Sequence, residues 1–303
     1  MNVIPDDIDF QTWYDMMEPV VKVRSAADCM DALIDEIKNP SQIKPVLMPW
    51  SKTSDLFQFR PGEVTVFAGT NGSGKSLITG QIALSLVGQN ERIVIASFEM
   101  KPLRTLKRMV RQWCHLASPA IEHYEAFQEW VGDKMWFYDQ QGTVNPQQVI
   151  GVGVYAAEKL NCKHYLIDSL MKCLRDEDDY NGQKNFTDEL CSLARDKEIH
   201  IQLVHHIRKQ SNDEHPPNKN DLKGSGSVAD QVDNVVLMHR NRKKEREFEA
   251  NGVVEKSTPD AYLSIEKQRN GEYEGVIRLW YDRQSQQFVE VIDGAPIKFN
   301  ADF

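Results

Sequence analysis

A chain of 303 residues, 41% of them hydrophobic and 27% charged, is long enough for one large or two small domains and has an ordinary soluble composition. The net charge of −9 argues against a generally basic surface, so any contact with nucleic acid is expected to be local, in a groove or channel. No apolar run approaches the roughly 20 residues of a membrane-spanning helix, and the first ten residues lack signal-peptide features. We therefore expect a cytoplasmic protein without a membrane partner.

The leading segment, residues 1–45, contains two short helical patterns and no recognisable catalytic site. The second pattern begins at a capping-box match, Ser25 to Asp28, carries apolar residues on one face, and stops before Pro40. Such a helix can pack on its own domain or serve as a linker helix that docks on a neighbouring subunit. The residues alone leave both interpretations open.

A glycine-rich loop, GTNGSGKS, follows an apolar run at 64–68 and precedes a helical pattern at 77–86, the order that a P-loop requires. Its glycines let backbone N–H groups wrap around a polyphosphate, and the start of the helix adds a positive end. In this arrangement Lys75 reaches the β- and γ-phosphates and the Ser76 hydroxyl is a ligand of Mg²⁺. The predicted nucleotide-binding residues are Gly69, Thr70, Asn71, Gly72, Ser73, Gly74, Lys75 and Ser76.

Two carboxylates end the next buried strand patterns. Glu99 follows the apolar run at 92–98, and Asp168 ends the run at 164–168. In open α/β sheets, ligands bind at the carboxyl ends of the strands. Asp168 there is a Walker B aspartate that holds Mg²⁺ opposite the P-loop serine. Glu99 could orient and deprotonate an attacking water, although on that residue alone a solvent-facing glutamate is the favoured interpretation.

Further along the chain, a strand at 199–204 runs into His205 and His206. No third ligand lies at a suitable spacing and the five cysteines form no CxxC pair, so a metal site of the zinc type is not expected. The position of the two histidines at a strand end instead favours a role for one of them in contacting a γ-phosphate. Residues 210–221 are expected to form a mobile loop. The segment 221–226 combines a lysine with glycines and could approach a phosphodiester strand or be an ordinary helix-entry loop.

The other patterns complete an alternation of strands and helices. A basic helix face at 102–116 is interpreted as solvated, and a charged excursion at 241–260 as a surface loop or hairpin. Two C-terminal runs are expected to pair antiparallel and close the sheet. The remaining expected elements are strands at 135–139, 235–238, 261–265, 276–281 and 287–292, and a helix at 146–160.

Taken in order, these motifs resemble the RecA-like motor domain of DnaB-type replicative helicases, most closely the phage and mitochondrial Twinkle-like branch, over about residues 45–295. The resemblance rests on GTNGSGKS, SFEM at 97–100, LIDS at 166–169, HIRK at 206–209, DLKGSGSVADQVDNVV at 221–236 and KQRNG at 267–271. It implies an α/β fold with a RecA-like P-loop NTPase core: a mainly parallel sheet flanked by helices, with antiparallel C-terminal strands. It also implies a division into a helical segment or linker helix, 1–45, and a motor domain, 46–303.

Residue roles follow from the same resemblance. Glu99 becomes the catalytic base, and His206 becomes the γ-phosphate sensor. Lys267 and Arg269 resemble the trans-acting lysine and arginine finger that enter the neighbouring subunit's site. The positions that flank the adenine base are matched by Arg240 and Tyr281. The residues implied to line a central pore and hold single-stranded DNA are Arg208, Lys209, Lys223, Gly224, Ser225 and Gly226.

The resemblance implies an ATP-dependent DNA helicase that uses ATP and Mg²⁺, translocates on single-stranded DNA as a homo-hexameric or similar ring, and unwinds duplex during replication. A separate primase, polymerase or loader would be its partner, in the host cytoplasm if the source is a phage. A RecA- or RadA-like recombination ATPase and an ATP-controlled loader without unwinding are the alternatives. Two features depart from the family pattern: a leading segment too short for the usual N-terminal domain, and the residues after Asp168 together with the insert at 241–260.

Overall fold

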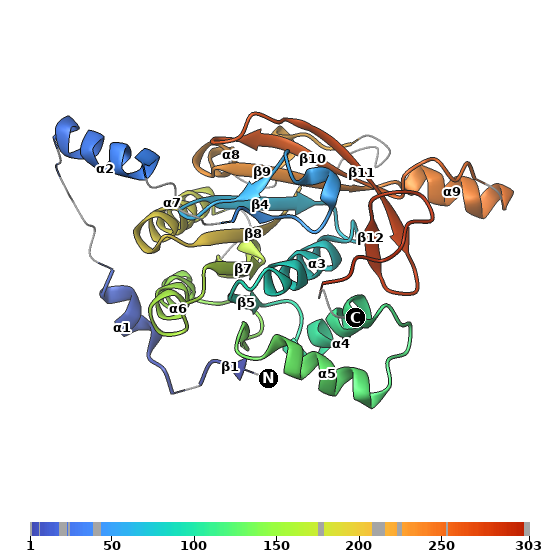
Figure 1. Ribbon diagram of the computed structural model, residues 1–303, viewed down its shortest axis with the longest axis horizontal. Coiled ribbons are helices and arrows are strands. Elements are labelled where there is room, and N and C mark those ends of the chain that lie inside the picture. The colour runs from blue at the N-terminus through green and yellow to red at the C-terminus, as the bar shows by residue number, and fades with distance from the viewer. Residues whose placement is uncertain are drawn as a thin grey trace.

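The computed structural model describes residues 2–5, 7–17, 23, 25–38, 44–174, 179–207, 216–222, 226–252 and 254–299 (Figure 1). Within these residues, one sheet of ten strands runs through the molecule in the order β1-β6-β5-β7-β8-β4-β9-β10-β11-β12. The strands are β1 (Asn2–Val3), β4 (Val64–Gly69), β5 (Ile93–Ser97), β6 (Met135–Tyr138), β7 (His164–Asp168), β8 (His200–His206), β9 (Asn234–Arg240), β10 (Ala261–Gln268), β11 (Gly275–Asp282) and β12 (Gln287–Val289). A separate small pair joins β2 (Val46–Leu47) to β3 (Gln58–Phe59).

The sheet has a parallel part and an antiparallel part. All pairings from β1 to β9 are parallel, and β10, β11 and β12 then add on antiparallel. This confirms the predicted α/β fold with antiparallel C-terminal strands. The predicted strand at 287–292 is shorter than expected, because only its first three residues pair.

Helices cover both faces of the parallel part (Figure 1). The α-helices are α1 (Phe10–Asp15), α2 (Ala26–Lys38), α3 (Lys75–Gly88), α4 (Pro102–Cys114), α5 (Ile121–Val131), α6 (Pro146–Lys159), α7 (Tyr180–Lys197), α8 (Ser227–Gln231) and α9 (Arg242–Asn251). Apolar residues of α6 and α7 form one core layer, and those of α3, α4 and α5 form the other. Successive residues of β4 alternate between them: Val66 belongs to the first layer and Phe67 to the second. The continuous apolar runs in the sequence therefore reflect strands that are buried on both faces.

The start of the chain packs on the sheet edge. The two residues of β1 pair with β6, and α1 lies against α6. The ring of Phe10 is 5.4 Å from that of Tyr138 and 6.0 Å from that of Tyr155, in edge-to-face contacts. The expected helix at 25–38 is present as α2, which extends away from the body (Figure 1) with Met30, Leu33, Ile34 and Ile37 exposed.

The predicted surface loop or hairpin at 241–260 is wrong, because its first half is the helix α9. The Asn241 side chain accepts a hydrogen bond from Lys244 N at 3.1 Å and caps the helix. Lys243 and Glu247 then form an exposed i,i+4 ion pair. α9 has no buried residue, so the apolar stripe that usually reveals a helix in a sequence is missing. Among all described helices, none combines the length and apolar character needed to cross a membrane.

Candidate active site

The glycine-rich loop joins the end of β4 to the start of α3, as the sequence predicts. A Cβ on Gly69 would lie 2.5 Å from the carbonyl oxygen of Met238 on the adjacent strand. Gly72 and Gly74 have φ of +74° and +95°, in the left-handed region that favours glycine. Each of the three glycines is therefore required by crowding or by backbone conformation.

The side chain of Lys75 folds back into the glycine-rich loop. Its ammonium donates hydrogen bonds to the carbonyl oxygens of Gly69 and Thr70, at 2.9 and 3.0 Å. Burial lowers the pKa of Lys75, while the charges of Asp168 and Glu99 act in the opposite direction. The buried hydroxyl of Ser73 has no hydrogen-bond partner among the described residues. The Lys75 ammonium and the unpaired Ser73 hydroxyl both belong to this loop, and together they provide a positive charge and a hydrogen-bond donor suited to a phosphate group.

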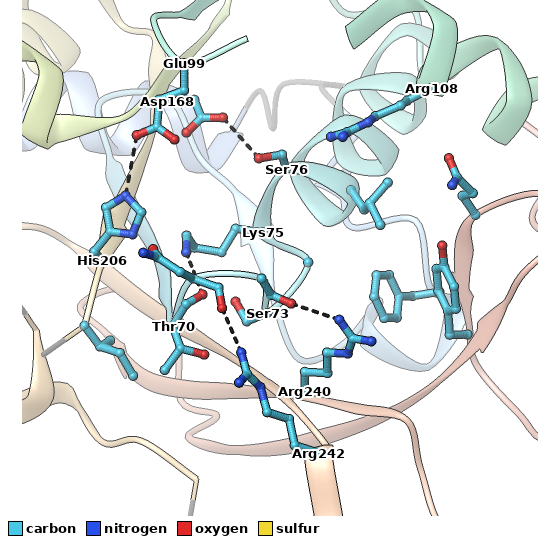
Figure 2. Close-up of a pocket in the computed structure, with 18 of the residues that line it drawn as sticks. Thr70, Ser73, Lys75, Ser76, Glu99, Arg108, Asp168, His206, Arg240 and Arg242 are labelled. Atoms are coloured by element: carbon cyan, nitrogen blue, oxygen red, sulfur yellow. Dashed lines mark hydrogen bonds and ion pairs between the residues drawn. The ribbon is translucent and has the colours of Figure 1, made fainter. Parts of the chain in front are cut away.

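The Walker B carboxylate lies opposite the P-loop serine. The Ser76 hydroxyl donates to Asp168 Oδ2 at 3.3 Å (Figure 2). Burial, followed by the negative charge of Glu99, raises the pKa of Asp168 to about 6. A buried carboxylate and a hydroxyl are the oxygen ligands that Mg²⁺ prefers, and a cation would compensate the charge that burial disfavours. The residues present therefore fit this metal.

A second carboxylate reaches the same sheet edge. Oε1 of Glu99 accepts a hydrogen bond from the Ser169 hydroxyl at 3.0 Å and lies 3.6 Å from Nε2 of His206. His206 and then Ser169 hold the pKa of Glu99 at about 2, against a partial opposing effect of burial. Glu99 is therefore ionised throughout the neutral range and is held by two neighbours, unlike a solvated strand-end glutamate.

These groups line a cleft of about 1560 Å³. The lining includes the P-loop, Glu99, Asp168 and His206, together with Arg240 and Tyr281. Arg240 Nη1 donates to the carbonyl oxygen of Gly72 at 3.3 Å, which fixes the arginine beside the outer turn of the P-loop (Figure 2).

The sequence model of the DnaB-like helicase C terminal domain matches residues 55–290. The chain belongs to this family. Its activity is that of a replicative DNA helicase, which hydrolyses ATP. Two solved structures share the fold. One, described as the ATPase domain of G40P, is 15% identical with a TM-score of 0.72 and covers 89% of this chain and 100% of its own. The other, a DnaB-like replicative helicase studied for its interactions with primase, is 15% identical with a TM-score of 0.69 and covers 88% of this chain and 67% of its own.

The cleft of this helicase domain also contains side chains that the sequence does not predict. The basic pattern of α4 indicates a solvated face, yet Arg108 points from this helix into the cleft (Figure 2). A basic helix face looks the same in a sequence whether it borders water or a cleft. The other unpredicted residues at the cleft wall include Lys172, Arg242, Glu245, Asp260, Arg283, Gln286 and Phe288.

Lys267 and Arg269 lie at the opposite end of the strands from the P-loop. Lys267 pairs with Val235, near the start of β9, whereas Gly69 pairs with Met238 further along. Arg269 Nη1 lies 2.9 Å from Asp233 Oδ1. Five residues of extended chain separate Asp233 from Met238, about 17 Å at 3.3 Å per residue. The helicase domain therefore does not bring Lys267 and Arg269 into its own cleft.

Both side chains have partners within the chain. The Lys267 ammonium donates to the carbonyl oxygens of Ala229, Asp230 and Val232 at 2.8, 2.9 and 2.7 Å, around the end of α8. Most of the predicted DNA-contacting residues fall outside the described residues: Arg208, Lys209, Lys223, Gly224 and Ser225. Gly226, which precedes α8, is described and exposed.

Proposed function

We propose that the cleft binds ATP with Mg²⁺, with the phosphates on residues 69–76 and the base between Arg240 and Tyr281. The observation that carries this proposal is the convergence of Ser76, Asp168 and Glu99 on one sheet edge. Ser76 and Asp168 would hold the metal. A Mg²⁺ ion held there would neutralise the negative charge that develops on the phosphates.

Glu99 is proposed to hold the attacking water. Its carboxylate is ionised at neutral pH and fixed by Ser169, so it can accept a hydrogen bond from water in a defined direction. A pKa of about 2 favours orienting the water over removing its proton before attack. His206, beside Glu99, is proposed to sense the γ-phosphate. It ends β8 two residues before Arg208, so a movement of His206 would pass directly to a proposed DNA-contacting segment.

Lys267 and Arg269 are proposed to act on the cleft of a neighbouring copy. Their position at the far strand end supports this, because they cannot reach the P-loop of their own chain. Positive charge delivered there stabilises the γ-phosphoryl group in the transition state, and a finger arginine is worth about 10³ to 10⁵ in rate. Hydrolysis would then depend on assembly into a ring.

We further propose that the ring, a hexamer or similar, translocates on single-stranded DNA through its centre, and that α2 docks on an adjacent subunit. The exposed apolar face of α2 supports the docking. An acidic exterior is consistent with DNA contacts confined to a channel. The similar DnaB-like helicase that interacts with primase supports a separate primase as a partner. The proposed compartment is the cytoplasm, that of the host for a phage protein.

Trans action can be tested by co-expressing two inactive variants, Lys75→Ala and Arg269→Ala, and measuring ATP hydrolysis stimulated by single-stranded DNA. Each variant alone is expected to be inactive. Mixed rings should recover about a quarter of the wild-type rate, since half the subunits bind ATP and half their neighbours carry the arginine. Unchanged hydrolysis by Arg269→Ala alone, or no recovery in mixed rings of normal size, would contradict trans action.

A further inference from the structure

The insert that contains α9 forms part of the wall of the nucleotide cleft. Arg242, its first helical residue, donates to the carbonyl oxygen of Asn71 at 2.9 Å and so ties the helix start to the P-loop (Figure 2). Glu245, one turn further on, lines the cleft. The insert is therefore fixed beside the nucleotide at its first turn.

Glu245 is paired with the arginine proposed to flank the base. Its Oε1 atom lies 2.5 Å from Arg240 Nε, while Arg240 Nη1 reaches Gly72. Both side chains remain partly exposed, at 49% for Arg240 and 38% for Glu245, so a ligand in the cleft can reach them. Because the Nε–H bond lies in the guanidinium plane, the carboxylate lies at the edge of the group whose face Arg240 would offer to a base, and Oε2 of Glu245 has no hydrogen-bond partner among the described residues.

The other carboxylate in this part of the cleft is already engaged. Asp260 Oδ1 lies 2.7 Å from the Lys244 ammonium, and Oδ2 accepts from Tyr281 N at 2.8 Å. Both oxygens of Asp260 therefore have partners, whereas Oε2 of Glu245 has none among the described residues and is the better placed to accept a hydrogen bond from a ligand. An ionised carboxylate accepts and never donates.

The four bases differ at the position such an acceptor would read. Adenine and cytosine carry an amino group, at N6 and N4, whereas guanine and uracil carry a carbonyl oxygen, at O6 and O4. A carboxylate beside an amino group gains a charge-assisted hydrogen bond. Beside a carbonyl oxygen it meets a second acceptor and gains none.

We propose that Glu245 determines the base specificity of the site, by accepting a hydrogen bond from the exocyclic amino group of adenine or cytosine while it holds Arg240 in place. The inference rests on the proposed function, in which Arg240 and Tyr281 flank the base. It assigns to the insert a role in substrate choice.

The test is calorimetric titration of the full chain with ADP, GDP, CDP and UDP, which avoids turnover. The wild type is expected to bind ADP about tenfold more tightly than GDP, and CDP about tenfold more tightly than UDP, the worth of one hydrogen bond to a charged group. Glu245→Ala should bring both ratios to within about twofold. Glu245→Gln should do the same, because its amide can donate to a carbonyl oxygen or accept from an amino group.

Glu247→Gln is the matched control, since Glu247 lies on the same helix and pairs with Lys243 on the exposed surface. It should keep both wild-type ratios. Arg240→Ala tests the base site separately from the specificity role of Glu245. If it weakens all four nucleotides while Glu245→Ala leaves both ratios unchanged, the specificity role is overturned and the base site stands. If Arg240→Ala weakens none of them, the base site itself is overturned.

Discussion

Nε2 of His206 lies 3.6 Å from Oε1 of Glu99, although the two residues follow different strands, β8 and β5, with β7 between them. The contact exists because all three strands are parallel and end at the same edge. It gives the carboxylate a neighbour that both lowers its pKa and continues into a proposed DNA-contacting segment. In the proposed mechanism, this one side-chain pair would therefore link hydrolysis to DNA contact.

Replacing Glu99 with glutamine should separate hydrolysis from binding. The amide keeps the size of the carboxylate and can accept from Ser169, so the ATP dissociation constant should stay within about threefold of wild type. Hydrolysis should fall by about 10² or more, because the neutral amide no longer holds the attacking water in the productive orientation. Phosphate release and calorimetric binding measure the two quantities. Glu122→Gln, on the surface helix α5, is the control. Wild-type turnover in Glu99→Gln would remove Glu99 from the proposed mechanism.

Gly74→Ala should abolish the nucleotide site. The residue has φ of +95°, and its new Cβ would lie 2.8 Å from the Met238 methyl and 3.1 Å from the Phe288 ring. ATP affinity should drop at least about tenfold, since strain of this kind costs about 1–3 kcal/mol. Gly142→Ala is a matched control, because Gly142 has φ of +88° but open space around it and lies outside the cleft. It should lower Tm and leave ATP affinity intact, and an equal loss of affinity in both variants would refute the steric argument.

Acid should destabilise the fold through His200. Burial, then the nearby His164, lowers the pKa of His200 to about 3, while its ring nitrogens contact Thr65 Oγ1 and the carbonyl oxygen of Arg60. Well above pH 6.5, the imidazole is neutral in both the folded and the unfolded state and contributes no pH dependence. Below 6.5 only the unfolded chain binds the proton, so stability falls by about 1.4 kcal/mol per pH unit down to about 3.

Urea unfolding of the wild type and His200→Gln at pH 7.5, 6.5 and 5.5 measures this contribution. Relative to pH 7.5, the free-energy gap between the two proteins should narrow by about 0.4 kcal/mol at pH 6.5 and by about 1.4 kcal/mol at pH 5.5. Parallel stability curves over the whole range would show that His200 is not responsible.

Gly151→Ala should detach α1 from α6. A Cβ at this position would overlap the carbonyl oxygen of Phe10, a backbone atom that cannot rotate away. Hydrogen exchange of the α1 amides should rise toward the unprotected rate, with ATP binding unchanged because the cleft is formed elsewhere. Glu158→Gln, on the exposed face of α6, should leave α1 protected. Full protection of α1 in Gly151→Ala would contradict the docking.

The P-loop, Glu99 and Asp168 could be placed from the sequence, because the P-loop is a local motif and the two carboxylates each follow or end a buried strand. The P-loop shows its glycines, preceding strand and following helix within about twenty residues of sequence. Glu99 and Asp168 could be assigned to one edge because both end buried strands, and such strands are parallel in α/β folds. The structure adds the side-chain partners, which local pattern does not encode.

Apart from Arg240 and Tyr281, which the family resemblance implies, the cleft wall around α9 could not be predicted, because it depends on the order of strands and on a helix without an apolar face. Arg242 and Glu245 reach the cleft only because β9 lies next to β4 and continues into α9. A two-residue strand such as β1 carries no periodicity, so its pairing with β6 also left no signal in the sequence.

The two outermost strands of the sheet are very short, with two residues in β1 and three in β12. A short edge strand exposes few unpaired backbone groups and is a poor template for a strand of another molecule. Short edge strands therefore disfavour edge-to-edge pairing of copies into a continuous sheet. Fibrillar aggregation depends on such pairing. In the proposed ring, copies of the chain would instead meet through side chains at the ends of the strands, which carry the P-loop at one end and Arg269 at the other.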